Sequence, residues 1–92
     1  MDYQGALAVA KGILDCPPHY GIVDIGRADD FWAFYGGYLD GIDRDLNPSI
    51  VVVMKESGEI IQPQIPSADG FALLDEVTSW IDGVLGQCRF DW

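Results

Sequence analysis

Residues 49–65 read SIVVVMKESGEIIQPQI, two extended runs joined by a short turn. The first run, residues 49–55, carries apolar side chains on both faces, which is typical of a strand in the interior of a sheet. The turn that follows contains Gly58, which can adopt the positive φ that a tight hairpin requires. Residues 59–65 form the partner strand, and Pro63 places this strand at the sheet edge because proline cannot donate a ladder hydrogen bond.

Two more strands precede this hairpin. Residues 31–38 read FWAFYGGY and are again apolar on both faces. In the strand predicted over residues 20–26, strict alternation puts Ile22 and Ile25 on opposite faces. Hairpin-length connections favour antiparallel neighbours, although loop 39–48 is long for such a connection and long loops in compact domains are often functional. We therefore expect a four-stranded antiparallel meander whose second and third strands are central.

Two helices flank these strands. Residues 2–15 have apolar side chains at helical spacing, with Asp2 placed to cap the N-terminus. Residues 67–86 form the second helix, with Ser67 as its N-cap and Gly86 as its C-terminal stop. The apolar positions are Tyr3, Ala6, Leu7, Ala10, Ile13 and Leu14 in the first helix, and Phe71, Leu74, Val77, Thr78, Ile81 and Leu85 in the second. The predicted fold is α+β in the order α-β-β-β-β-α. Both helices on one face of the sheet would leave an apolar face for an interface, whereas helices on both faces would cover it.

Composition limits the function. The chain has 92 residues, enough for a single domain over residues 1–92, and 15 acidic side chains against 5 basic ones give a formal net charge of −10. Such a surface repels phosphate backbones, which argues against direct nucleic-acid binding. The sequence lacks a signal-peptide pattern and an apolar run of the roughly 20 residues that span a bilayer, so we expect a cytoplasmic protein without membrane contact. In that compartment Cys16 and Cys88 are expected to be two thiols, and a bridge between them would require the two helix ends to meet.

Motifs for catalysis or metal binding are weak. A zinc site needs about four ligands, and beside Cys16 and Cys88 the sequence offers only His19 as a histidine. Residues 43–47 imitate the start of an EF-hand calcium loop, but Pro48 stands where that loop needs glycine. No G-x-S-x-G motif activates a serine. We expect no metal, no cofactor and no enzymatic activity, and a hydrolase built on Cys16 and His19 is the weakest hypothesis.

The strongest functional signal is a mixture of acids and aromatics between residues 24 and 45. Carboxylates steer a basic partner and pair with its arginines and lysines, while exposed aromatic rings supply central contacts. The pattern predicts a surface that recognises a basic protein. The predicted partner-binding residues are Asp29, Asp30, Trp32, Tyr35, Tyr38, Asp40, Asp43 and Asp45.

The segments DFWAFY at residues 30–35 and NPSIVVVMKESGEI at residues 47–60 resemble immunity-protein family 35 of bacterial polymorphic toxin systems. That family has a helix, an aromatic strand with a W-x-F core, and a hairpin of the form P-x-hydrophobic-V-x-K-x-x-G-x-hydrophobic. Met54 departs from it, because an aspartate often stands there. The resemblance implies a non-enzymatic antitoxin that binds a cognate toxin and carries no catalytic residues.

These observations predict an immunity protein that neutralises a toxin domain by covering a basic active site, such as that of a nuclease. Two alternatives remain. One is a phage-encoded acidic inhibitor, or nucleic-acid mimic, directed at a host defence nuclease. The other is a structural domain that forms a homodimer through an uncovered face of the sheet.

Overall fold

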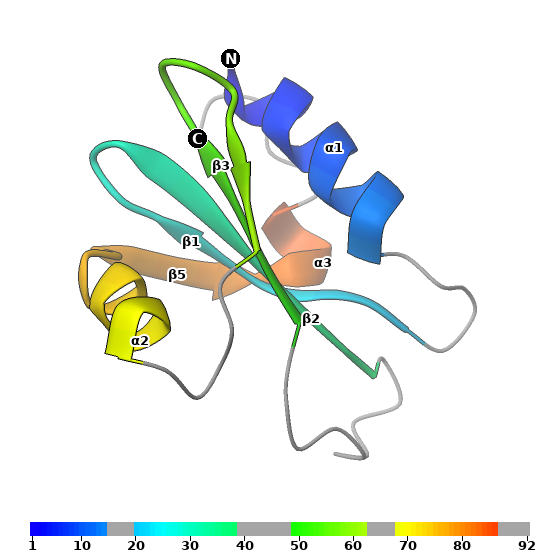
Figure 1. Ribbon diagram of the computed structural model, residues 1–92. Helices are drawn as coiled ribbons and strands as arrows, with labels where there is room; N and C mark the ends of the chain where they lie inside the picture. The colour runs from blue at the N-terminus through cyan, green and yellow to red at the C-terminus, as the bar shows by residue number, and fades with distance from the viewer. Residues whose placement is uncertain (15–19, 39–48, 63–67, 87–92) are drawn as a thin grey trace.

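The computed structural model describes residues 1–14, 20–38, 49–62 and 68–86 (Figure 1). Its elements, in chain order, are α1 (Tyr3–Leu14), β1 (Tyr20–Arg27), β2 (Phe31–Tyr38), β3 (Ser49–Met54), β4 (Ile60–Ile61), α2 (Ala68–Asp75), β5 (Ser79–Asp82) and α3 (Gly83–Gly86). The strands form an antiparallel sheet in the order β4-β3-β2-β1-β5. The predicted α+β fold is confirmed, with β2 and β3 in the interior of the sheet and β4 at one edge. The sheet has a fifth strand that the prediction lacks, so β1 also lies in the interior and β5 forms the second edge.

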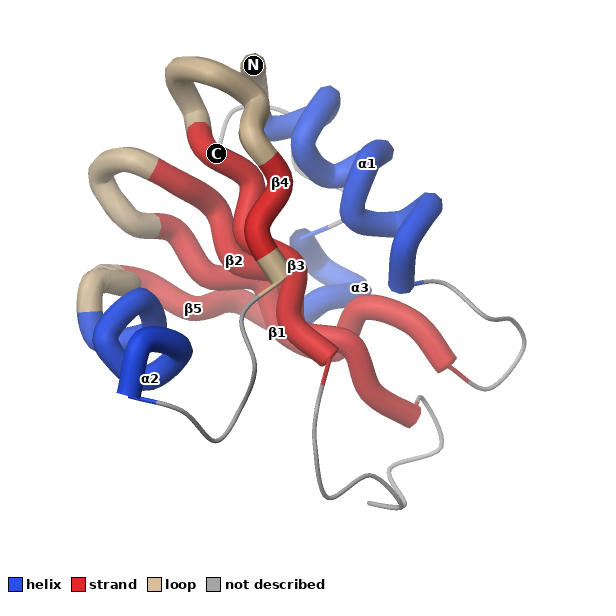
Figure 2. The backbone as a smooth tube through the Cα atoms, in the orientation of Figure 1, coloured by secondary structure: helices blue, strands red, loops and turns tan. Residues whose placement is uncertain are grey.

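Helices cover both faces of the sheet, which decides between the two arrangements that the sequence leaves open (Figures 1 and 2). On one face, α1 contacts β1, β2 and β3, and the short α3 contacts β1. On the other face, Leu73 and Leu74 of α2, with Val77 just beyond it, pack against the second core cluster. No helix among the described residues is long and apolar enough to cross a membrane.

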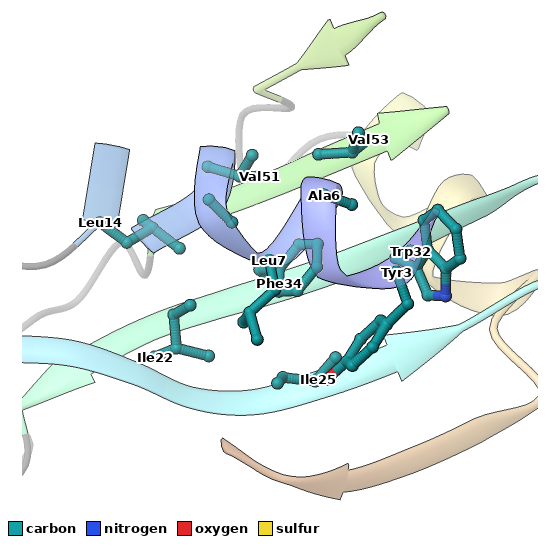
Figure 3. Packing of buried hydrophobic residues seen from close by; sticks show 11 residues of the cluster. Tyr3, Ala6, Leu7, Leu14, Ile22, Ile25, Trp32, Phe34, Val51 and Val53 are labelled. Carbon is teal, nitrogen blue, oxygen red and sulfur yellow. The ribbon is translucent and has the colours of Figure 1, made fainter. Parts of the chain in front are cut away.

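The first core cluster lies between α1 and the sheet (Figure 3). Its members are Tyr3, Ala6, Leu7, Ala10, Leu14, Ile22, Ile25, Trp32, Phe34, Val51 and Val53. The predicted helix and its cap are confirmed, since the Gly5 N–H donates to Oδ1 of Asp2 at 2.8 Å. Ile13, expected on the apolar face, is instead 42% exposed because it lies at the margin of the packed stripe. The Tyr3 hydroxyl donates to the carbonyl of Gly86 at 2.7 Å and so joins α1 to α3.

The second core cluster lies on the α2 face of the same strands. Its buried members are Ala28, Phe31, Ala33, Ile50 and Val52, and Tyr35, Met54, Ile61, Leu73, Leu74 and Val77 pack against it. Alternate residues of β2 and β3 therefore enter different clusters, as the apolar pattern on both faces predicts. Each face needs its own covering helix because burial of these side chains is what stabilises the sheet.

The prediction of a helix over residues 67–86 is wrong beyond Asp75. The chain leaves α2, and Ser79–Asp82 pairs antiparallel with β1 as the edge strand β5. The Thr78 N–H and hydroxyl both donate to the carbonyl of Arg27, at 2.9 and 3.1 Å. Two causes favour the strand: residues 77–81 are rich in β-branched and aromatic side chains, and β1 has an edge that gains hydrogen bonds from a partner.

The predicted alternation along β1 is also wrong. A β-bulge between Ile22 and Asp24 shifts the register with β2, so that Ile22 pairs with Gly36 and Asp24 with Tyr35. The extra residue, Val23, changes which side chains face α1. Ile22 and Ile25 consequently enter the same core cluster instead of lying on opposite faces.

The positive φ predicted for Gly58 in the β3–β4 turn is confirmed. Gly58 has a φ of +73°, and its N–H donates to the carbonyl of Met54 at 2.9 Å. The partner strand is described only over Ile60–Ile61, and Pro63 lies outside the described residues. Cys16, His19, Ser67 and Cys88 also lie outside them.

We predict that Gly83→Ala lowers the melting temperature by several degrees. A Cβ at Gly83 would collide with the carbonyl group of Ile22, so α3 and β1 would have to separate. Overpacking of this kind costs about 1–3 kcal/mol, and 1 kcal/mol moves the melting temperature of a domain this size by about 4–8 °C. Circular dichroism melting measures the change. The matched control is Gly12→Ala in α1, where the added methyl group meets nothing within 4 Å and helix propensity improves. An unchanged melting temperature for Gly83→Ala would contradict the close contact.

Candidate functional site

Three turns lie side by side at one end of the sheet. They connect β1 to β2, β3 to β4, and α2 to β5 (Figure 2). The Lys55 N–H donates to the carbonyl of Asp30 at 2.9 Å and joins the first two turns. The bonds from Thr78 to Arg27 join the third turn to the first. Backbone hydrogen bonds therefore hold this end of the molecule as one unit.

The side chains displayed by these turns are acidic. Asp29, Asp30 and Glu56 line one shallow depression together with Lys55 and Met54. Asp29 and Asp30 also line a second depression with Ala28, Phe31 and Glu76. We call the four carboxylates Asp29, Asp30, Glu56 and Glu76 the acidic turn surface. All four side chains are exposed.

The charge of the acidic turn surface is not offset by ion pairs among the described residues, since none of its four carboxylates forms one there. Lys55 lines the same depression, but its ammonium lies 5.1 Å from the centre of the Trp32 ring, a cation–π contact. Clustered carboxylates on turns produce a negative potential that draws in cationic molecules.

Two of the predicted partner-binding residues, Asp29 and Asp30, belong to this surface. Trp32 does not, and the expectation that it is displayed outward is wrong. It is only 5% exposed, lies in the first core cluster and packs at 5.9 Å from the Tyr3 ring. Its indole nitrogen is buried without a hydrogen-bond partner. Trp32 is buried because it lies on a central strand beneath α1, where burial of its large ring stabilises the fold.

The remaining predicted residues lie elsewhere. Tyr35 is half-buried on the α2 face, opposite to the face that carries Trp32. Tyr38 ends β2, and its side chain lies outside what the structure describes. Asp40, Asp43 and Asp45 lie outside the described residues altogether.

Strand β2 separates the two acidic segments that the sequence suggested as one surface. Asp29 and Asp30 precede β2, and loop 39–48 leaves from its far end. Eight residues of strand span about 23 Å. Because the turn and the loop are attached at opposite ends of β2, their roles in binding can be tested with separate variants.

Sequence reasoning missed Glu56 and Glu76. Glu56 could have been found, because alternate turns of an antiparallel meander lie at the same end of the sheet, so the turn after β3 joins the turn after β1. Glu76 could not have been found, because the sequence predicts it in the middle of a helix over residues 67–86. In the structure that helix ends at Asp75, and Glu76 lies in the turn that follows.

A second acidic feature lies on the α2 face, away from the turns. Asp24 of β1 is directly opposite Asp82 of β5, and both side chains are exposed. Partial burial, with a smaller contribution from the negative charge of Asp82, raises the pKa of Asp24 above its ordinary value of 3.8. Like charges directly opposite each other on neighbouring strands destabilise the pairing.

We predict that Asp24→Asn stabilises the fold at neutral pH. Because the pKa of Asp24 is raised on folding, the folded chain binds this proton more tightly than the unfolded chain does. The stabilising contribution is therefore complete below pH 3.8 and is lost as the pH rises through the raised pKa. Removing the charge should raise the free energy of unfolding by roughly 0.2–1 kcal/mol at pH 7. Urea unfolding measures it.

The control for this prediction is Glu59→Gln, which removes one charge from an exposed position in the β3–β4 turn. It reports how much stability comes from lowering the overall charge alone. Asp24→Asn should stabilise more than the control at pH 7, and the difference should shrink below pH 3.8. An equal effect of both variants at every pH would mean that the Asp24–Asp82 pair has no specific cost.

No group of three or more His, Cys, Asp or Glu side chains within the described ranges is arranged to hold a metal ion. A comparison of this chain with protein-family models, with curated proteins and with solved structures finds no match. The resemblance to immunity-protein family 35 therefore stays a prediction. The chemistry of the acidic turn surface is the basis on which a function can be proposed.

Proposed function

We propose that this protein binds another protein of basic surface and inhibits it stoichiometrically, in the manner of a bacterial immunity protein. The observation that carries the proposal is the acidic turn surface, four exposed carboxylates from three turns that form no ion pair within the described chain. The formal net charge of −10 adds a long-range attraction for a cationic partner.

The way these carboxylates are held also supports binding. The turns are joined to each other by hydrogen bonds from Lys55 to Asp30 and from Thr78 to Arg27. A surface that is already ordered loses less conformational entropy on association, so more of the interaction energy appears as affinity. Carboxylates on such a surface favour fast association and selectivity for a basic partner.

A nuclease is the class of target that best fits this chemistry. Nucleases grip phosphates with basic residues, and carboxylates can occupy the positions that phosphates would take. Inhibition of this kind needs no bond-making by the inhibitor. It requires only that the carboxylates reach the basic residues of the target and exclude the nucleic acid.

We predict that Asp29→Asn, Asp30→Asn and Glu56→Gln together raise the dissociation constant for the target at least tenfold. The target is first isolated from cells of the source organism with the immobilised protein and identified by mass spectrometry. It is then produced separately, and binding is measured by calorimetry and stopped-flow kinetics. Tenfold corresponds to about 1.4 kcal/mol. The association rate should fall most, and added salt should reduce the difference between variant and wild type.

The matched control is Asp40→Asn, Asp43→Asn and Asp45→Asn, which removes the same charge from loop 39–48 at the other end of β2. If the turn variant binds within about threefold of wild type, the proposal for the acidic turn surface is wrong. A large effect of the loop variant alone would assign binding to the loop instead. An isolated partner without a basic surface would also contradict the proposal.

A further inference from the structure

The edge strand β5 displays a tryptophan on the α2 face of the sheet. Trp80 is 44% exposed and lies directly opposite Gly26 of β1. A Cβ at Gly26 would come within 3.0 Å of ring atoms of Trp80, so the glycine makes room for the indole against the strand. One part of the ring is therefore packed while the rest meets solvent. Large exposed aromatic side chains of this kind are enriched where proteins bind partners.

Tyr35 of β2 extends this aromatic surface. Its ring centre lies 6.4 Å from that of Trp80, and the two planes meet at 72°. The two side chains come from strands on either side of β1, and Asp24 of β1 is the residue directly opposite Tyr35. Two rings in this edge-to-face arrangement hold each other in place, which lowers the entropy lost when a ligand contacts them.

Carboxylates border the two rings. Asp24 pairs in register with Tyr35 on one side and with Asp82 on the other. The side chains of directly opposite residues are about 4.5–5.5 Å apart at Cβ, so both carboxyl groups lie within reach of a cation placed on the rings. Trp80, Tyr35, Asp24 and Asp82 together form what we call the aromatic–acidic patch.

Charge complementarity identifies the occupant. In a homodimer built on this patch, the two carboxylates of one protomer would face and repel those of the other. The same carboxylates, beside an aromatic π-face, attract a cation. Partial burial and, to a smaller extent, the negative charge of Asp82 raise the pKa of Asp24, and a cation between the two carboxylates would offset the repulsion from Asp82. Among cationic side chains, arginine stacks on aromatic rings and offers a planar fork of donors to carboxylates, whereas lysine is a compact charge.

We propose that the aromatic–acidic patch is a docking site for an arginine side chain of a partner protein. The identity of the partner rests on the proposed function, whereas the preference of the patch for arginine rests only on the residues of the patch. The patch supplies the aromatic contact that Trp32, buried in the core, does not provide. The patch lies on the α2 face, distinct from the acidic turn surface at the end of the sheet.

The test is an NMR titration with a tetra-arginine peptide, followed through the tryptophan indole N–H resonances. Trp80→Phe assigns the resonance of Trp80 among the tryptophan signals. We expect the Trp80 resonance to shift saturably and to report at least threefold tighter binding of tetra-arginine than of tetra-lysine, which has the same charge. Asp24→Asn should weaken binding of tetra-arginine at this site at least threefold.

The charge-matched control is Glu59→Gln, which removes one negative charge from an exposed position in the β3–β4 turn, outside both proposed binding surfaces. It should change the affinity read at Trp80 less than twofold. A Trp80 resonance that does not move, equal affinity for the two peptides, or an equal effect of the two variants would overturn the proposal. Because the peptide replaces the natural partner, this result stands whether or not the search for a target succeeds.

Discussion

Strands β2 and β3 are buried on both faces, and the rest of the structure depends on that requirement. A sheet whose central strands are apolar on both sides must be covered on both sides, since exposure of either face would cost burial free energy. Helix α1 covers one face and α2 the other. The chain then returns to the first face, where Tyr3 of α1 bonds to Gly86 of α3. It makes that return through β5, which is why α2 ends at Asp75 instead of continuing.

The same return path creates the features with functional interest. By pairing with β1, β5 places Asp82 opposite Asp24 and Trp80 opposite Gly26. The like-charged pair destabilises the pairing of these strands, and the exposed part of the Trp80 indole adds nothing to burial. The hydrogen bonds from Thr78 to Arg27 that begin this pairing also fix the turn carrying Glu76 beside the turn carrying Asp29 and Asp30.

The two proposed binding surfaces would serve different parts of one recognition process. Exposed carboxylates on turns act over a distance and chiefly accelerate and orient encounter, and salt screens them. An aromatic ring beside carboxylates acts only in contact, where it supplies a larger share of the binding energy. Partner recognition through both would combine fast association with a specific anchor. The buried position of Trp32 shows why aromatic content alone does not identify such an anchor, since a ring on a central strand serves the core.

Local patterns were enough to identify α1 with its Asp2 cap, the extents of β1 to β3, the turn at Gly58 and the edge position of β4. Each depends on neighbours in sequence: helical spacing, runs of apolar side chains, a positive φ, and the missing donor of Pro63. The strand β5 and the bulge at Val23 could not be found this way. Leu74, Val77 and Ile81 fit a helical stripe as well as they fit their actual places. The β-branched and aromatic residues at 77–81 favour a strand only together with the unpaired edge of β1. Asp29 and Asp30 were predicted as partner-binding residues from the mixture of acids and aromatics between residues 24 and 45. The juxtaposition of Trp80, Tyr35 and Asp24, in contrast, comes from pairing between strands distant in sequence, which local periodicity does not encode.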